Sequence, residues 1–224
     1  MKLKKRVCLV ALIAMSVSAI TLASIPRGWE KVSDDNGISV ARQEVAGSPL
    51  VAFRGEAVID APMAKVANVL MDTSRKLEWV SDIKEARDIR QINQFERVEY
   101  NHTGTPWPTT DRDFVFHATA KLDRANQSMT FELKSIVDPA VPETKNVRGE
   151  LKQSYYKLTS IANGTKTMLE VEIQADPKGA IPKWLVNLTQ KKWPRKTIEG
   201  IRAQCAKPDV LEHPGIKAYF ASKG

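Results

Sequence analysis

The sequence has few of the residues that carry out catalysis or hold metal ions. It contains two cysteines and three histidines in 224 residues. The histidines, His102, His117 and His213, are far apart in the sequence, and no zinc-protease, nucleophile-elbow, phosphate-loop or dinucleotide-binding motif is found. We therefore expect no catalytic residue, no metal ion and no cofactor.

The shortage of cysteine also excludes a disulfide within the mature chain. Cys8 lies in an apolar N-terminal run, so Cys205 is the one cysteine left when that run is removed. A lone thiol at an apolar helix position packs as a small hydrophobic side chain. The core, rather than disulfides, must stabilise this fold even in an oxidising compartment.

The first 23 residues have the pattern of a secretory signal peptide. Four cations occur in MKLKKR, an apolar run follows over residues 7–23, and small residues near Ala19 and Ala23 provide two candidate cleavage sites. The run is at the lower limit for crossing a bilayer, so an uncleaved N-terminal anchor is the alternative. The segment predicts a periplasmic or secreted protein, which is membrane-anchored if the signal is not cleaved.

The net charge of the chain is +8, and four of these charges belong to the N-terminal segment. The remaining excess of about +4 is compatible with attraction to an anionic membrane surface. No dense run of lysine and arginine with interleaved aromatic residues is present, so we do not expect nucleic acid as a partner.

Hydrophobic patterning predicts one domain over residues 28–207, followed by a tail over 208–224. Strand patterns occur at 37–42, 51–59, 86–92, 95–101, 112–122, 129–136, 147–160 and 167–175, and helix patterns begin near 60, at 74 and near 181. This order predicts an α+β helix-grip fold, in which a curved antiparallel sheet is wrapped round a long C-terminal helix with an internal apolar tunnel. Such a tunnel suits an apolar ligand.

Pro194 interrupts the C-terminal helix pattern, which continues to about Cys205. A proline inside a helix removes one backbone hydrogen bond and commonly produces a kink. Two interpretations follow: two helical segments joined at Pro194, or a lid whose weak middle turn moves.

Arg112 lies at an unexpected position in a strand pattern. Strand alternation places its side chain on the same face as Phe114 and Phe116. A buried guanidinium requires a partner, and a hairpin centred on residues 105–106 would place Glu99 directly opposite Arg112. The aspartates on either side of Arg112 in the sequence are the alternative partners. Either the pair fixes the hairpin, or it lies in the tunnel and orients the polar head of a ligand.

Tryptophans occur at the ends of the expected elements. Trp107 and Trp184 each lie beside turn-forming residues, where an indole either packs in a core or contacts a membrane interface. We therefore predict four ligand-binding residues: Glu99, Trp107, Arg112 and Trp184.

Two segments resemble the best-marked motifs of START domains, the steroidogenic acute regulatory protein-related lipid-transfer family. The first is Pro106-Trp107-Pro108 followed by Arg112-Asp113-Phe114-Val115, and the second is DPKGAIPKWLVN at 176–187. The order of elements is similar over nearly the whole of residues 28–207. The resemblance suggests a single-domain member of the secreted, bacterial type.

This resemblance implies a helix-grip fold whose tunnel is closed by the C-terminal helix and nearby loops. Members of the family bind or carry one sterol, phospholipid or ceramide molecule without catalysis. Several have an acidic residue thirteen positions before the arginine of the R-D-F motif, as Glu99 stands to Arg112, and the two form a charged pair in the tunnel.

The sequence thus predicts non-catalytic binding and transfer of a single lipid by a monomer that contacts membranes transiently. One alternative is an enzyme of the helix-grip superfamily, a cyclase or hydrolase acting on an apolar substrate, for which Glu99 is the one candidate acid or base. Another is an interaction module whose tunnel is filled by side chains.

Overall fold

The computed structural model describes residues 26–48 and 50–222. The predicted signal peptide lies outside these residues. Ten strands form one sheet in the order β1-β2-β3-β10-β9-β7-β6-β5-β4, in which all neighbours are antiparallel, and β8 pairs in parallel with β6. The strands are β1 Glu30–Asp35, β2 Ile38–Glu44, β3 Val51–Ile59, β4 Ile83–Asn93, β5 Glu96–Thr103, β6 Arg112–Asp123, β7 Ser128–Ser135, β8 Val147–Arg148, β9 Glu150–Ile161 and β10 Lys166–Asp176.

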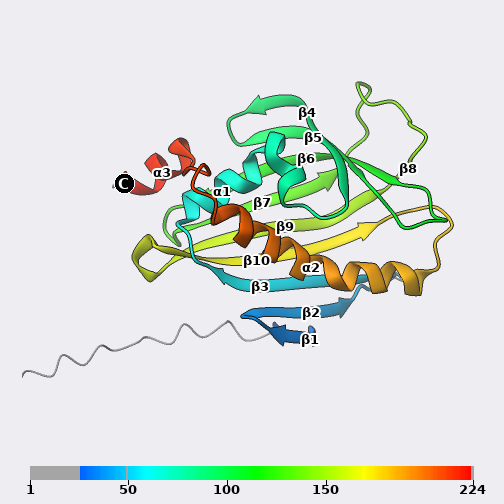
Figure 1. The fold of residues 1–224 in the computed structure, drawn as a ribbon, viewed down its shortest axis with the longest axis horizontal. Coiled ribbons are helices and arrows are strands. Elements are labelled where there is room, and N and C mark those ends of the chain that lie inside the picture. The colour runs from blue at the N-terminus through cyan, green and yellow to red at the C-terminus, as the bar shows by residue number, and fades with distance from the viewer. Residues whose placement is uncertain (1–25, 49, 223–224) are drawn as a thin grey trace, which may run out of the picture.

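Helices cover one face of this sheet. They are α1 Met63–Met71, α2 Lys183–Cys205 and α3 Pro214–Ala221, with 3-10 turns η1 Thr73–Glu78 and η2 Ala162–Gly164. Figure 1 shows α2 lying along the sheet over β3 and β10, with α1 beside its C-terminal end. The predicted α+β helix-grip arrangement is confirmed.

The secondary structure differs from the prediction in two segments. Residues 147–160 form two strands rather than one, because the chain changes partner at Gly149: β8 pairs with β6, whereas β9 pairs with β7 and β10. A side chain at Gly149 would overlap the ring of Phe114. Strand β1 was not predicted, because it lies at the sheet edge with little buried surface and carries no alternation of polar and apolar residues.

Helix α2 runs without interruption through Pro194, so the interpretation as two separate segments is wrong. The proline lies against strand β3. A Cβ atom added to Gly55 of β3 would lie 2.8 Å from Pro194 Cβ and 2.9 Å from Ile198 Cδ1. Proline is normally unfavourable inside a helix. Its packing against the sheet at Gly55 accounts for its presence at this position.

The two halves of α2 have different surroundings. The C-terminal half places Ile198, Ile201 and Cys205 in the main hydrophobic core, together with α1 and Ile216 of α3. Cys205 is a buried free thiol whose pKa burial raises to about 11, as expected of a packing residue. The N-terminal half, by contrast, lies over an unfilled space.

Within the described residues, no helix has the length and apolar character needed to cross a bilayer.

Candidate functional site

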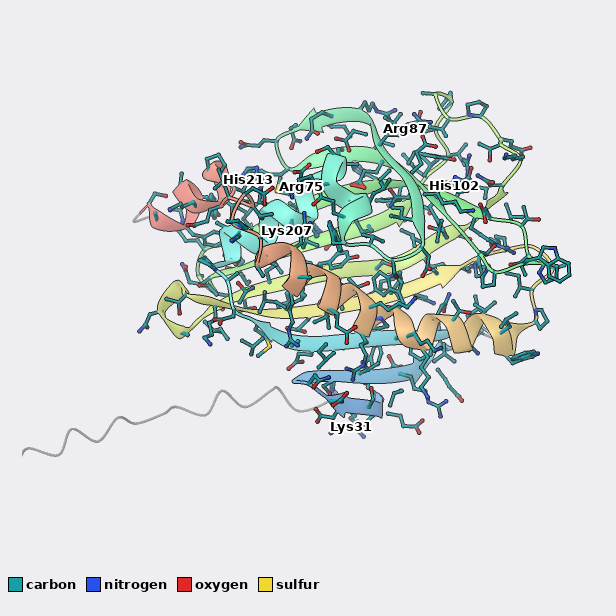
Figure 2. The ribbon with its side chains drawn as sticks, viewed as in Figure 1. Lys31, Arg75, Arg87, His102, Lys207 and His213 are labelled. Atoms are coloured by element: carbon teal, nitrogen blue, oxygen red, sulfur yellow. The ribbon has the colours of Figure 1, made fainter. Side chains whose placement is uncertain are left out.

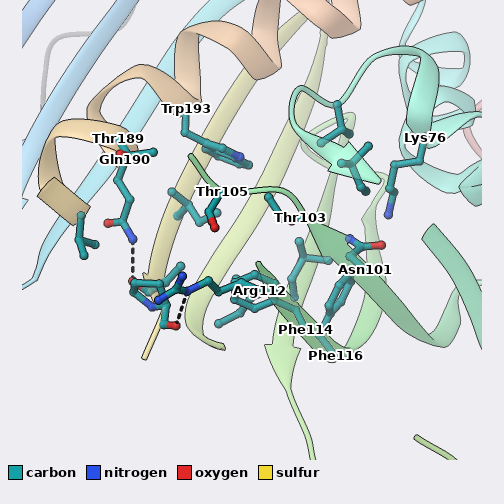
Figure 3. Close-up of a pocket in the computed structure, with 18 of the residues that line it drawn as sticks. Lys76, Asn101, Thr103, Thr105, Arg112, Phe114, Phe116, Thr189, Gln190 and Trp193 are labelled. Carbon is teal, nitrogen blue, oxygen red and sulfur yellow. Dashed lines mark hydrogen bonds between the residues drawn. The ribbon is translucent and has the colours of Figure 1, made fainter. Parts of the chain in front are cut away.

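A cavity of about 470 Å³ lies between the N-terminal half of α2 and the inner face of the sheet (Figure 3). Its volume is within the usual range for small-molecule sites. Helix α1, the turn η1, strands β4, β5, β6, β7, β9 and β10, and the loops at 105–109 and 177–181 also contribute to its lining.

Most of the lining is apolar or aromatic. Strand alternation places Phe114 and Phe116 on the same face, and Phe131 and Leu133 of β7 face the cavity in the same way. Trp193 of α2 closes the opposite side. The wall therefore suits a largely hydrocarbon ligand.

A cluster of charged side chains lines part of the cavity, and Figure 3 shows one member of it, Lys76. Glu99 is 1% exposed and is held by two buried cations, Lys76 of η1 and Arg97 of β5. Lys76 Nζ lies 3.0 Å from Glu99 Oε1, and Arg97 Nη2 lies 2.7 Å from the same oxygen. Arg97 also donates to the carbonyl of Leu70, at 3.2 Å.

These contacts keep Glu99 ionised. Burial alone would raise the pKa of its carboxyl group, but the charges and hydrogen bonds of Lys76 and Arg97 outweigh burial and hold the pKa below its usual value. All three groups must stay together, because removing one member leaves a buried charge without compensation.

The predicted ion pair between Glu99 and Arg112 is wrong. In the observed register, Thr103 lies opposite Arg112 and Glu99 lies opposite Phe116. The hairpin is centred on residues 107–108 rather than 105–106, which shifts the pairing by an even number of residues. An even shift preserves the face, so Glu99 and Arg112 both line the cavity but at different positions along it.

Arg112 is instead held by backbone carbonyls. Its side chain is 4% exposed, and its Nε and Nη2 atoms donate to the carbonyls of Pro177 and Lys178, both at 3.2 Å. Nη1 donates to the carbonyl of Thr110. Gly179 has a φ of +70°, and a Cβ atom there would lie 3.3 Å from Arg112 Nη2, so a glycine lets this loop close round the guanidinium.

The two predicted tryptophans lie at the surface. Trp107 is 92% exposed and contributes to the cavity lining from the loop at 105–109. Trp184 is 69% exposed and does not line the cavity, because the first turn of α2 points it outward. The next residues of the helix, Leu185 and Val186, do line it.

The prediction missed Lys76 and Arg97. Arg97 carried a usable signal, because period two places it with Glu99 and Asn101 on one face of β5. Lys76 carried none, since it comes from a separate turn twenty-three residues before its partner.

Three lining residues have a buried polar atom without a hydrogen-bond partner in the described chain: Trp79 Nε1, Asn101 Oδ1 and Gln190 Oε1.

The histidines do not form a site. Figure 2 shows His102 and His213 at opposite sides of the molecule. His102 Nε2 lies 2.8 Å from Asp111 Oδ2, and His213 Nδ1 accepts the amide hydrogen of Ile216 at the start of α3. Within residues 26–48 and 50–222, no three His, Cys, Asp or Glu side chains gather in a way that could hold a metal ion.

Comparison with known proteins agrees with this architecture. An uncharacterized protein of Pseudomonas aeruginosa is 27% identical over 197 residues, covering 87% of this chain and 95% of that protein. The mouse phosphatidylcholine transfer protein is 27% identical over 167 residues, covering 73% of this chain and 77% of its own length. The crystal structure of a STAR-related lipid transfer protein from Xanthomonas axonopodis has a TM-score of 0.72 at 27% identity, covering 80% of this chain and 99% of that one.

The model of the START domain family matches residues 11–206, from the N-terminal segment to the end of α2. This match spans the cavity-lining strands, the R-D-F motif and the helix that covers the cavity. The chain belongs to the START domain family.

Proposed function

We propose that this protein binds a single lipid molecule in the cavity and transfers it between membranes without catalysis. The observation that carries the proposal is the cavity of about 470 Å³ with its mainly apolar wall. The names of two similar proteins support it, since one is a phosphatidylcholine transfer protein and the other a lipid transfer protein.

Transfer from a membrane into such a cavity is close to isoenergetic. Each methylene group gains about 0.8 kcal/mol when it leaves water for an apolar environment, whether that environment is the cavity or a bilayer. Binding is therefore reversible, as a carrier requires.

The geometry disfavours the alternatives. An enzyme using Glu99 as a general base would require a pKa near the working pH, whereas this carboxylate has a lowered pKa and is held by two cations. A module whose tunnel is filled by side chains would leave no cavity at this position.

Native mass spectrometry tests the proposal directly. Protein purified from its own host is expected to carry one lipid per chain, because the apolar wall favours occupancy over water. A protein that remains empty after purification and after incubation with phospholipids, sterols and fatty acids would contradict lipid binding.

We further propose that Trp107 and Trp184 contact the membrane during transfer, and that the protein works as a monomer in the periplasm or outside the cell. Trp107 lies on a cavity-lining loop, and Trp184 begins the helix that covers the cavity. Both indoles are exposed, and an amphipathic ring in that setting suits a membrane interface.

Replacing both tryptophans with alanine is expected to slow lipid transfer between vesicles at least several-fold. The free energy of unfolding should stay close to wild type, because neither ring is buried. Leu211→Ala is the matched control, since it removes an equally exposed apolar side chain from the segment before α3. An unchanged transfer rate in the double variant would exclude membrane contact through these rings.

A further inference from the structure

The charged groups that line the cavity do not balance. Lys76, Arg97 and Arg112 are cations, and Glu99 is the one carboxylate among the lining residues. Glu99 is shared by Lys76 and Arg97, and Arg97 has a second carboxylate partner in Asp88, at 3.3 Å. That part of the cavity is therefore compensated within the protein.

Arg112 has weaker compensation, because the charge of neighbouring Asp111 acts on it without a direct ion pair. Within the described part of the chain it forms no salt bridge, and its three hydrogen bonds all go to backbone carbonyls. The neighbouring carboxylate of Asp111 is engaged elsewhere, with Lys84 at 2.7 Å and His102 at 2.8 Å. Carbonyl dipoles stabilise a buried guanidinium only in part, so a formal charge remains to be neutralised.

The guanidinium still has donors to offer. It carries five N–H groups, of which the three carbonyls account for three. Arginine binds carboxylate and phosphate oxygens through two parallel N–H groups, and such charge-assisted bonds are among the strongest in proteins. The vacant capacity of Arg112 thus matches an oxyanion.

We propose that the lipid in this cavity carries an anionic head, a carboxylate or a phosphate, that binds Arg112. The inference rests on the proposed lipid-binding function and specifies its ligand class. Phe114 and Phe116 follow Arg112 on the same face of β6, so the hydrocarbon part extends along them toward Lys76 (Figure 3). Gln190 lies at the Arg112 end, where Nε2 donates to the carbonyl of Ala175.

Three probes with the same sixteen-carbon chain test the proposal: hexadecanol, palmitate and hexadecyl phosphate. Delipidated protein is titrated with each at neutral pH and followed by native mass spectrometry. The affinities of palmitate and hexadecyl phosphate are expected to exceed that of hexadecanol by about tenfold or more. One hydrogen bond to a charged group contributes about this much. Inorganic phosphate at millimolar concentration is not expected to compete, because it lacks the chain.

Substitution of Arg112 assigns the preference to this residue. Arg112→Gln should bind all three probes equally. Lys121→Gln is the control, since it makes the same charge change at an exposed position of the same strand. Arg112→Lys keeps the charge without the planar fork, and is expected to retain part of the preference if the glutamine variant does not fold.

Each outcome decides the matter. The proposal of an anionic head is overturned if wild type binds the three probes equally, or if the preference persists in Arg112→Gln. Either result leaves the proposal of lipid binding intact. Competition by inorganic phosphate assigns Arg112 to a free anion and overturns the lipid-head proposal. Failure of all three probes to bind contradicts the proposed function itself.

Discussion

Replacing Glu99 with glutamine is expected to lower the free energy of unfolding by about 3 kcal/mol or more. The carboxylate is buried between Lys76 and Arg97, and both cations donate to it. A glutamine has the same shape but no charge. Its amide nitrogen is a hydrogen-bond donor and would face a cation that is also a donor. The variant therefore keeps two buried positive charges and loses the group that neutralises them. Urea unfolding at neutral pH, with an unchanged slope, measures the effect.

The difference between wild type and Glu99→Gln should depend on pH. The pKa of Glu99 is lowered in the folded state, so its contribution to stability is fully present above the unfolded pKa of about 4.3. This contribution is lost as the pH falls through the folded-state pKa, because the protonated carboxyl resembles the amide. The two unfolding curves are thus expected to converge in acid.

Two further variants distinguish charge compensation from a general loss of packing. Glu132→Gln removes a carboxylate whose partner Lys121 is exposed, and its effect should stay within about 0.5 kcal/mol. Adding Lys76→Met to Glu99→Gln should recover part of the lost stability, because Glu99 is the one carboxylate partner of Lys76 among the described residues, whereas Arg97 keeps Asp88. Equal stability of Glu99→Gln and wild type at neutral pH would show that the cluster is solvated.

The elements that sequence patterning predicted well are those in which buried and less buried positions alternate. Strand β10 is close to its predicted bounds because buried Leu169 and Val171 alternate with the less buried Glu170 and Glu172. Strand β1 has no such contrast and was missed. The sequence pattern does not predict helix α3 in the tail, which begins at Pro214 and buries Ile216, because so short a pattern does not stand out from a loop.

Strand alternation predicts which face of the sheet the site residues lie on, but not which residues they contact. Period two placed Arg112 and Glu99 on the inner face, and both line the cavity. Their partners depend on hairpin register and on tertiary contacts, and a loop with two prolines does not determine register. Two of the three carbonyls that hold Arg112 come from residues 177 and 178, more than sixty positions away, and no pattern in the sequence indicates that contact.

Substitution of Leu133 with tryptophan is expected to reduce lipid binding strongly while leaving the fold intact. Leu133 lies on the inner face of β7, is only partly buried and contributes to the cavity wall. A larger indole there extends into empty space rather than into packed atoms, so overpacking should be slight. If the ring displaces two or three methylene groups of the ligand, affinity falls by about 2 kcal/mol, or about thirtyfold.

The expected stability change has the opposite sign from that of an ordinary core defect. Filling the cavity buries apolar surface that the ligand-free protein leaves unpacked, so the delipidated variant should be at least as stable as delipidated wild type. Thr130→Trp is the matched control, because residue 130 alternates to the outer face of the same strand and should bind lipid as wild type does. Normal lipid occupancy in Leu133→Trp, measured by native mass spectrometry, would mean that the lipid lies elsewhere. Loss of binding together with retained stability would locate it between β7 and α2, because nothing else in the fold would have changed.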